Sequence, residues 1–208
     1  MTRDALRLYL VTDPDLCAAM GVEATVRAAV AGGVSMVQLR DKSATTAARV
    51  ELGRALKAAL AGTGVPLLIN DDLEAAVAAD VDGAHIGQDD TDPREARGRL
   101  GPEKVLGLSC EDAGAVVRAD PAVVDYLGIG PVFPTGTKTD HKPAIGMEGL
   151  AHLVALSPLP TVAIGGLKAE HRTQVLAVGA DGLAVVSAIC GQPDPTAAAE
   201  RFGGEVRV

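Results

Sequence analysis

The stretch "PLLINDDLEAAVAADVDGAHIGQDD", residues 66–90, contains two short apolar runs separated by an Ala-rich segment. The segment at 73–79 carries Ala, Leu, Glu and Val at helical spacing, which predicts a helix. The flanking runs PLLIN and AHIG do not alternate apolar and polar residues. Such runs are typical of strands in a parallel sheet that is buried on both faces. The stretch therefore predicts a strand, a helix and a second, parallel strand.

The same unit recurs along the chain. Apolar runs of strand type are LYLVT, MVQLR, PLLIN, AHIG, VLGLS, YLGIG, TVAIGG and LAVVS. Segments of helical character lie between or after them, at residues 23–31, 45–60, 73–79, 93–99, 112–119, 147–156, 169–178 and 195–201. About eight such repeats predict an α/β fold, a single (β/α)8 TIM barrel over residues 1–208. An open doubly wound sheet is the alternative, which the lack of GxGxxG in the loop at 130–143 weakens.

The composition narrows the function classes. The 208 residues are 48% hydrophobic, which is enough for one sizeable core. A net charge of −8 and an aromatic content of 2% argue against a nucleic-acid partner. No apolar run approaches the roughly 18 residues of a membrane span, and the N-terminal segment does not resemble a signal peptide. The sequence predicts a cytoplasmic protein without a membrane partner, and it leaves a homo-oligomer open.

The cysteines give no sign of a metal or redox motif. Cys17, Cys110 and Cys190 lie far apart and form no CxxC pair. We therefore expect small, buried thiols in a reducing compartment.

Polar side chains follow the predicted strands, at the end where TIM barrels carry their active sites. Gln38, Arg40 and Lys42 are spaced by two, so an extended segment places them on one face. They form a donor cluster suited to an anion or a polar heterocycle. The alternative is that Arg40 and Lys42 are solvated loop charges.

Acidic residues follow the third and fourth predicted strands, in Asn70-Asp71-Asp72 and in Asp89-Asp90. If these strands are neighbours, the acids approach one another, and close carboxylates repel unless a proton or cation lies between them. Mg²⁺ prefers oxygen ligands and binds through one or two carboxylates plus substrate phosphates. Asp71 and Asp90 therefore suggest a magnesium site with one ion per subunit. The alternative is that each acid caps the following helix.

The loop "GPVFPTGTKTDHKP", residues 130–143, follows the sixth predicted strand and is rich in hydroxyls and glycine. Thr135, Gly136, Thr137 and Lys138 could together hold a phosphate oxygen. Loops after the last two strands, here at 165–166 and 186–187, are the usual phosphate site of barrels. A tight turn is the alternative for the glycine pair, and the two interpretations are compatible.

Three further residues have more than one interpretation. Ser109 ends the fifth strand, where a helix cap is an alternative to a ligand role. His85 lies inside the fourth strand, where we expect a packed, hydrogen-bonded side chain. His141 lies in the loop at 130–143 and could titrate near neutral pH. No Ser-His-Asp or Cys-His nucleophile system is evident.

In their order and spacing, these motifs resemble the thiamine-phosphate synthase family, also called thiamine-phosphate pyrophosphorylase. The resemblance runs nearly end to end and is carried by LYLVTD, VQLRDK, LLIND, GAHIGQDD, GLSC, YLGIGPVFPTGTKTD, TVAIGGL and GLAVVSAI. It implies a barrel transferase of thiamine biosynthesis. Such an enzyme joins 4-amino-2-methyl-5-hydroxymethylpyrimidine diphosphate to 4-methyl-5-(2-phosphooxyethyl)thiazole, or to its carboxylated form, and releases diphosphate.

The resemblance also implies site residues. It implies that the pyrimidine diphosphate is bound by Gln38, Leu39, Arg40, Asp41, Lys42, Asn70, Ser109 and Lys138. It implies that Mg²⁺ is bound by Asp71 and Asp90. It implies that the thiazole phosphate is bound by Thr135, Gly136, Thr137, Gly166, Val186 and Ser187. Arg40, Lys42 and Lys138 would be catalytic because they stabilise the charge of the departing diphosphate.

The chain departs from the family pattern at two positions. Asp72 stands where the family commonly has a basic residue, so we expect added negative charge beside the metal. Asp89 stands where the family often has Glu, which leaves open which acid of the pair binds the metal.

The implied chemistry is a dissociative substitution that needs no protein nucleophile. The C–O bond to diphosphate breaks first, the aminopyrimidine stabilises the cation, and the thiazole nitrogen attacks. The loop at 130–143 is expected to close over both substrates and exclude water. Two rivals are a related thiazole tautomerase, which would use a histidine such as His141, and a non-catalytic barrel that senses or carries a phosphorylated ligand.

Overall fold

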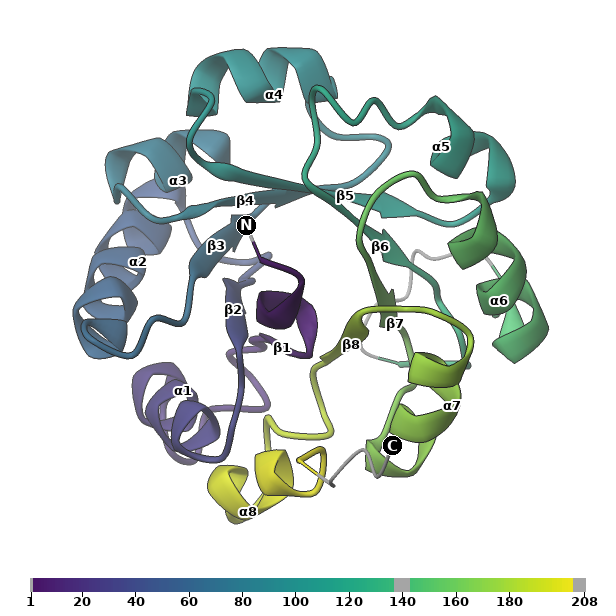
Figure 1. Cartoon of the computed structure of the whole chain (residues 1–208). Helices are drawn as coiled ribbons and strands as arrows, with labels where there is room; N and C mark the ends of the chain where they lie inside the picture. Colours follow the sequence, from purple (N-terminus) through teal and green to yellow (C-terminus); the bar gives the residue numbers. More distant parts are fainter. Residues whose placement is uncertain (1, 137–142, 204–208) are drawn as a thin grey trace.

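The structure is a computed structural model that describes residues 2–136 and 143–203. In this part of the chain, eight parallel strands close into a barrel in sequence order (Figure 1). Pairing of β1 with β8, with Tyr9 opposite Ala184, completes the closure. The predicted (β/α)8 barrel is confirmed and the open sheet is excluded. The strands are β1 (Leu8–Val11), β2 (Met36–Leu39), β3 (Leu67–Asn70), β4 (Gly83–Ile86), β5 (Val105–Cys110), β6 (Tyr126–Ile129), β7 (Thr161–Ile164) and β8 (Gly182–Val185).

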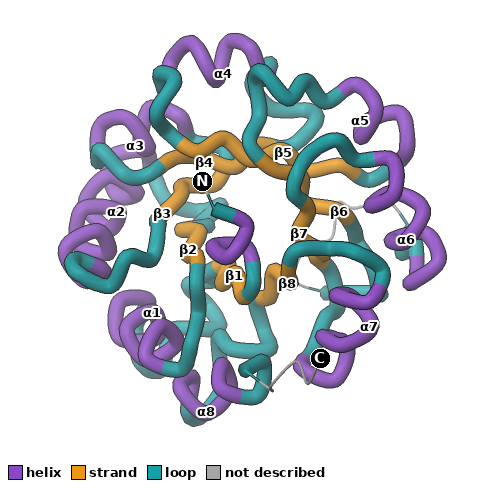
Figure 2. Tube along the Cα trace, in the orientation of Figure 1, coloured by secondary structure: helices purple, strands orange, loops and turns teal. Residues whose placement is uncertain are grey.

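Helices surround the strands and form the outer layer of the barrel (Figure 2). They are α1 (Val22–Ala31), α2 (Thr46–Leu60), α3 (Leu73–Ala78), α4 (Pro93–Leu100), α5 (Ala113–Arg118), α6 (Gly146–Leu156), α7 (Arg172–Ala177) and α8 (Pro195–Glu200). The helix expected over 169–178 is divided into a 3-10 turn, η2 (Ala169–His171), and α7. Among the described residues, no helix combines the length and the apolar character of a membrane span.

Side-chain caps fix where several helices begin. The hydroxyl of Thr45 accepts a hydrogen bond from Ala48 N and caps the first turn of α2. Asp92 accepts from two N–H groups at the start of α4, directly before Pro93. These caps set the point at which each loop leaves the barrel rim.

Two apolar cores hold the fold together. The larger core lies between strands and helices and contains residues such as Leu39, Leu56 and Ile69. The smaller core fills the barrel interior and includes Tyr9 and Met36. A short 3-10 helix, η1 (Arg3–Leu6), lies across one end of the barrel (Figure 1) and adds Leu6 to the inner core. The other end is therefore the one available for a site.

The three cysteines are buried and carry free thiols, as the sequence predicts. Cys17 and Cys190 belong to the outer core together with Cys110.

Candidate active site

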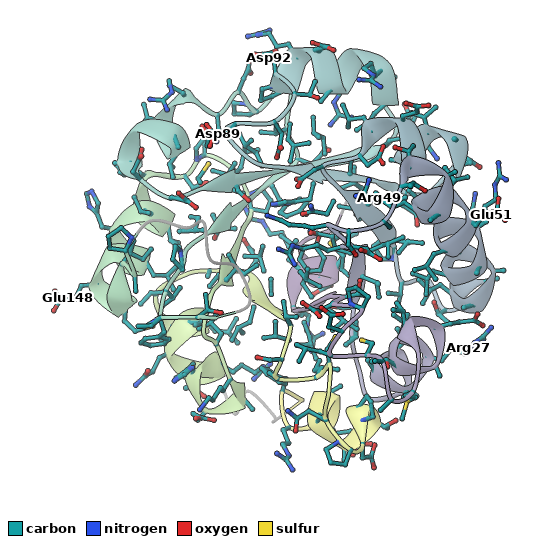
Figure 3. All side chains as sticks on the ribbon, turned by 180° about the vertical axis from the view of Figure 1, so that it is seen from behind. Arg27, Arg49, Glu51, Asp89, Asp92 and Glu148 are labelled. Carbon is teal, nitrogen blue, oxygen red and sulfur yellow. The ribbon has the colours of Figure 1, made fainter. Side chains whose placement is uncertain are left out.

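A cavity of about 660 Å³ lies at the carboxyl ends of the strands. Figure 3 looks at the barrel from the side opposite to η1, with Asp89 labelled on the loop after β4. Most of the predicted site residues line this one cavity: Gln38, Arg40, Lys42, Asn70, Asp71, Asp90, Ser109, Thr135, Gly136, Gly166, Val186 and Ser187. Thr137, Lys138 and His141 lie outside the described residues.

Alternate residues at the end of β2 lie on opposite faces of the strand, and one of these faces lines the cavity. Gln38, Arg40 and Lys42 line the cavity, as the spacing of two predicts. Leu39 is 1% exposed and packs in the outer core instead. Asp41 turns back on its own loop, where its carboxylate accepts hydrogen bonds from Ser43 N at 2.9 Å and Ala44 N at 3.0 Å. The side chain of Leu39 therefore belongs to the outer core and that of Asp41 supports the loop, and neither residue is among those that line the cavity.

Asp71 is held in position by neighbouring strands. Its N–H donates to the carbonyl of His85 at 2.9 Å, because β3 and β4 pair with Asn70 opposite His85. Its φ of 60° lies in the left-handed region, which Asp adopts more readily than most residues. Asn70 Nδ2 donates to Asp71 Oδ2 at 2.5 Å. The backbone of the strand end thus aims this carboxyl into the cavity.

Asp71 and Asp90 meet in the cavity. Burial, a hydrogen bond with Asp90 and the negative charge of Asp90 together raise the pKa of Asp71 to about 6, against the lowering effects of Asn70 and Lys42. Asp90 is itself anchored, because its Oδ2 accepts from Gly87 N at 2.7 Å. The expected approach of acids from adjoining strands is therefore present.

The donor set of these two acids fits Mg²⁺. Within residues 2–136 and 143–203, no group of three or more His, Cys, Asp or Glu side chains is arranged to hold a metal ion by itself. Mg²⁺ does not need such a group, since it commonly binds one or two carboxylates and completes its shell with water and substrate phosphates. Two converging carboxyls beside a cavity that also contains Arg40 and Lys42 suit such shared binding.

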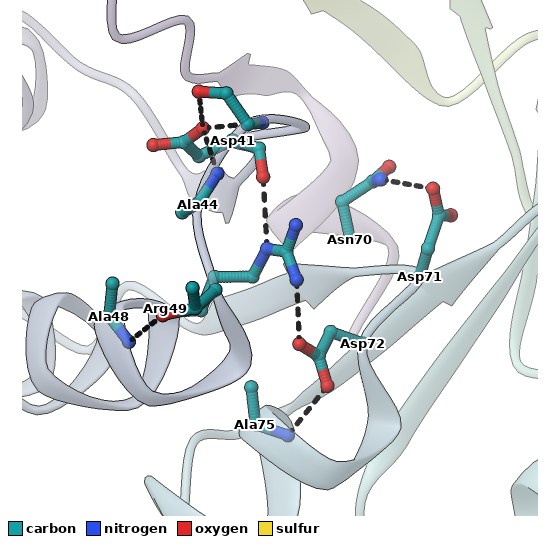
Figure 4. A network of polar contacts seen from close by, with 10 residues as sticks. Asp41, Ala44, Ala48, Arg49, Asn70, Asp71, Asp72 and Ala75 are labelled. Carbon is teal, nitrogen blue, oxygen red and sulfur yellow. Dashed lines mark hydrogen bonds and ion pairs between the residues drawn. The ribbon is translucent and has the colours of Figure 1, made fainter.

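Asp72 behaves differently from its neighbour Asp71 (Figure 4). One oxygen of Asp72 accepts from Ala75 N at 2.9 Å and caps α3, while the other pairs with Arg49 at 2.8 Å. Burial raises the pKa of Asp72, but the bonds from Ala75 and Arg49 outweigh it and lower the pKa overall. The negative charge that we expected beside the acids is thus paired with Arg49. The capping alternative holds for Asp72, whereas Asp71 faces the cavity.

Arg49 also ties two loops of the site together. Its Nε donates to the carbonyl of Asp41 at 2.9 Å, and its Nη1 donates to Asp72 (Figure 4). The loop that carries Lys42 is thereby joined to the loop that carries Asp71. Nothing in the sequence spacing indicates this link, because Arg49 lies within α2.

Glycine turns form the opposite side of the cavity. Gly165 and Gly166 have φ values of 99° and 63°, which favour glycine. A Cβ on Gly166 would lie 2.7 Å from the carbonyl oxygen of Pro134. Phe133 N donates to the carbonyl of Gly165 at 3.0 Å, so the loop after β6 packs directly on this turn. That packing brings Thr135 to the cavity wall together with Gly166.

The cavity floor contains polar residues that the sequence motifs do not single out as site residues. His85 is 8% exposed and hydrogen-bonded through both ring nitrogens, which confirms the expected packed histidine. It also lines the cavity beside Tyr9, which was not predicted. Tyr9 and Tyr126 lie in the apolar runs LYLVT and YLGIG. Because a buried tyrosine hydroxyl normally requires a hydrogen-bond partner, two tyrosines in buried strands are the one sign of this polar group that the sequence contains.

A closed (β/α)8 barrel with converging acids, cationic side chains and glycine turns at its carboxyl end defines a barrel enzyme of phosphorylated small molecules. The chain belongs to the thiamine monophosphate synthase family, whose sequence model matches residues 8–189.

Individual relatives agree with this assignment. The chain is 54% identical to a thiamine-phosphate synthase of Xanthobacter autotrophicus over 201 residues, covering 97% of this chain and 95% of that protein. It is 50% identical to one of Azorhizobium caulinodans, covering 93% and 92%. Among solved structures, the thiamine phosphate pyrophosphorylase of Pyrococcus furiosus superposes with a TM-score of 0.87 at 33% identity, covering 97% and 95%. A 3-hexulose-6-phosphate synthase with a TM-score of 0.66 and 18% identity shares the fold alone.

Proposed function

We propose that this cavity joins an aminopyrimidine diphosphate to a thiazole phosphate and releases diphosphate, giving thiamine phosphate. The reaction is the transferase step of thiamine biosynthesis after which the relatives are named. The observation that carries the proposal is the meeting of Asp71 and Asp90 in a cavity that also holds Arg40 and Lys42. This is the combination that a departing diphosphate requires.

We call the part of the cavity wall formed by Arg40, Lys42, Asp71 and Asp90 the acidic side, and it serves the leaving group. Mg²⁺ bound by Asp71 and Asp90 would neutralise charge on the diphosphate as it departs. Arg40 and Lys42 reach the same space and would bind diphosphate oxygens. Lys138 belongs to this group by sequence only. Because charge stabilisation and not covalent attack drives bond breaking, the reaction needs no protein nucleophile.

We call the part of the cavity wall formed by Thr135, Gly136, Gly165 and Gly166 the glycine side, and it serves the second substrate together with the end of β8. Gly166 and Ser187 lie at the ends of β7 and β8, where barrels commonly bind a phosphate, and Thr135 adds a hydroxyl nearby. A phosphate held there would fix the thiazole nitrogen opposite the pyrimidine carbon. Alignment of two substrates is worth about 7–11 kcal/mol in favourable cases. The predicted closure of the loop at 130–143 concerns residues that are partly outside the described ones and remains a sequence-based prediction.

The tautomerase alternative finds no support in the described part of the cavity. Such an enzyme would need a histidine that is available to move protons. His85 engages Tyr126 at 2.8 Å and Ser109 at 2.9 Å through its two ring nitrogens. His141 lies outside the described residues. A cytoplasmic location belongs to the same proposal, because three buried free thiols suit a reducing compartment.

One assay tests the proposed function. Purified protein would be incubated with both substrates, with each one alone, and with EDTA in place of Mg²⁺. We expect diphosphate and thiamine phosphate in equal amounts, and only when both substrates and Mg²⁺ are present. Isomerisation of the carboxylated thiazole without release of diphosphate would instead identify the tautomerase.

A further inference from the structure

A chain of hydrogen bonds crosses the barrel interior beneath the cavity. Gln38 Nε2 donates to the Tyr9 hydroxyl at 2.7 Å, and Tyr9 contacts the Tyr126 hydroxyl at 2.9 Å. Tyr126 contacts His85 Nδ1 at 2.8 Å, and His85 Nε2 contacts Ser109 Oγ at 2.9 Å. The two ends, Gln38 and Ser109, line the cavity, whereas Tyr126 is fully buried. The chain therefore connects two groups that a ligand can touch.

The direction of the bonds follows from counting hydrogens. The Gln38 amide nitrogen can only donate, so the Tyr9 hydroxyl oxygen accepts this bond. Within residues 2–136 and 143–203, the only other side-chain partner of Tyr9 is Tyr126. The single hydroxyl hydrogen of Tyr9 must therefore go to Tyr126. The hydrogen of Tyr126 must then go to His85 Nδ1. That nitrogen is bare, and the ring hydrogen sits on Nε2 and points to Ser109.

The ends of the chain consequently have opposite roles. Ser109 accepts from His85, so its own hydrogen is left for the cavity. Gln38 uses its nitrogen for Tyr9, so its Oε1 is left to accept from a ligand. A protonated imidazole would not fit this pattern, because the hydrogen of Tyr126 would then lack an acceptor.

We propose that Tyr9, Tyr126 and His85 are positioning residues that fix the hydrogen-bonding roles at the two ends of the chain of hydrogen bonds. Gln38 is thereby held as an acceptor and Ser109 as a donor. This pair of roles selects a 4-amino over a 4-oxo pyrimidine. This inference rests on the proposed function for the identity of the ligand. An aminopyrimidine offers an N–H donor at its amino group and bare ring nitrogens as acceptors. An oxopyrimidine offers a carbonyl acceptor and a ring N–H donor, so its pattern is the reverse.

The neighbouring strands are shaped around this chain. Strand pairing places Gly107 of β5 between His85 of β4 and Tyr126 of β6. A Cβ on Gly107 would lie 2.2 Å from Tyr126 Cζ and 2.5 Å from His85 Nδ1. The ring of His85 also lies over Gly128, 3.1 Å from the position that its Cβ would occupy. Two glycines in β-strands thus make room for these side chains.

Burial keeps both phenols in the protonated form. It raises the pKa of Tyr9 to about 12 and raises the pKa of Tyr126 well above its ordinary value. Each link therefore carries one hydrogen at neutral pH. Exchanging the donor and acceptor roles of Gln38 and Ser109 would require every hydrogen bond between them to reverse its direction. Reversing only some of these bonds would leave a buried hydrogen without an acceptor.

The first test determines the direction of these hydrogen bonds in the unmodified protein. The ¹⁵N shifts of the His85 ring, assigned by comparison with a His85→Asn variant, report which nitrogen carries hydrogen. We expect a neutral ring with hydrogen on Nε2, both alone and with the aminopyrimidine diphosphate bound. Hydrogen on Nδ1, or on both nitrogens, would overturn the proposed direction. This measurement does not require turnover, so it stands even if the proposed function fails.

The second test breaks the middle link. Tyr126→Phe keeps the ring beside Gly107 and removes only the hydroxyl. We expect the ratio of kcat/KM for the amino substrate to that for the 4-oxo analogue to fall about tenfold or more, with KM for the thiazole phosphate unchanged. Met36→Leu is the matched control, since Met36 packs in the same inner core without a polar link. It should keep the ratio.

The outcomes separate the possible failures. Equal loss of selectivity in Tyr126→Phe and Met36→Leu would mean that packing and not hydrogen bonding sets the preference, which overturns the proposal. An unchanged ratio in a folded Tyr126→Phe variant would overturn it as well. If that variant does not fold, Tyr9→Phe frees the Gln38 end and is expected to lower the same ratio. If the unmodified protein forms no thiamine phosphate, the proposed function is contradicted. The ¹⁵N measurement on His85 then still decides the direction of the hydrogen bonds.

Discussion

The two sides of the cavity reach a similar purpose by different means. On the acidic side, which we define as Arg40, Lys42, Asp71 and Asp90, charged side chains project from the ends of β2 to β4. On the glycine side, which we define as Thr135, Gly136, Gly165 and Gly166, backbone turns form the wall. The acidic side depends on the charge of its side chains, whereas the glycine side depends on the absence of a Cβ at its turns. Substitutions should therefore fail differently on the two sides.

The largest effect is expected from Asp71→Ala. It removes the carboxyl that shares a hydrogen bond with Asp90, so the site loses one of the two carboxyls that we propose bind Mg²⁺. Because metal-assisted charge stabilisation is worth several kcal/mol, we expect kcat to fall by about 10³-fold or more and the residual rate to lose its dependence on Mg²⁺. Diphosphate release measured across a Mg²⁺ titration checks this.

The stability of the same variant provides its control. Asp71 is a partly buried acid beside a second acid, and this arrangement disfavours the ionised pair when no cation is bound. Alanine adopts the left-handed φ of this position less readily than Asp, which offsets that gain, so the thermal unfolding midpoint of metal-free Asp71→Ala should lie close to that of the unmodified protein. A midpoint far below it would assign the loss of activity to misfolding, and a fully active variant would rule out the metal assignment.

The second largest effect is expected from Gly166→Ala on the glycine side. The added Cβ would lie 2.7 Å from the Pro134 carbonyl oxygen, at a φ of 63°. We expect stability to fall by about 1–3 kcal/mol and KM for the thiazole phosphate to rise about tenfold, with the Mg²⁺ dependence retained. Gly98→Ala is the matched control because Gly98 lies in α4 with nothing within 4 Å. A rise in the Mg²⁺ requirement of Gly166→Ala would break the distinction between the two sides.

A smaller effect is expected from Arg49→Met, which tests the support of the acidic side. Arg49 and Asp72 are 18% and 11% exposed at their side chains, so removing the cation leaves a largely buried carboxylate without its partner. We expect a loss of about 1–3 kcal/mol in the free energy of unfolding, measured with urea, and a weaker apparent affinity for Mg²⁺. Arg54→Met is the control, since the Arg54–Glu51 pair is 58% and 77% exposed, and its loss should cost about 0.5 kcal/mol or less. Equal losses in the two variants would contradict a supporting role for Arg49.

The contrast between the sides also explains what the sequence could predict. Apolar runs, helix spacing and strand-end acids are local patterns, so the barrel and the approach of Asp71 to Asp90 were predictable. The pairing of Asp72 with Arg49 joins residues in different elements, and no local pattern indicates it. The contact between Tyr9 and Tyr126 spans 117 positions and depends on the space above Gly107. Links of this kind follow from three-dimensional packing, which periodicity does not contain.

The smallest effect is expected from Asp89→Asn, and it sharpens the choice between neighbouring acids. Both Asp89 and Asp90 line the cavity. Both residues are exposed, but Asp90 is the one that Gly87 N anchors and that meets Asp71. Asp89 is not among the groups that shift the pKa of Asp71, and an exposed charge without such a contact is screened by water and salt. Its removal should therefore alter kcat by about twofold or less. Asp90→Asn removes the same charge one residue away and should lower activity nearly as much as Asp71→Ala. If Asp89→Asn proved the more damaging change in a Mg²⁺ titration, the proposed metal ligand would be Asp89 instead of Asp90. The contrast between an acidic side built from charged side chains and a glycine side built from backbone turns would still stand.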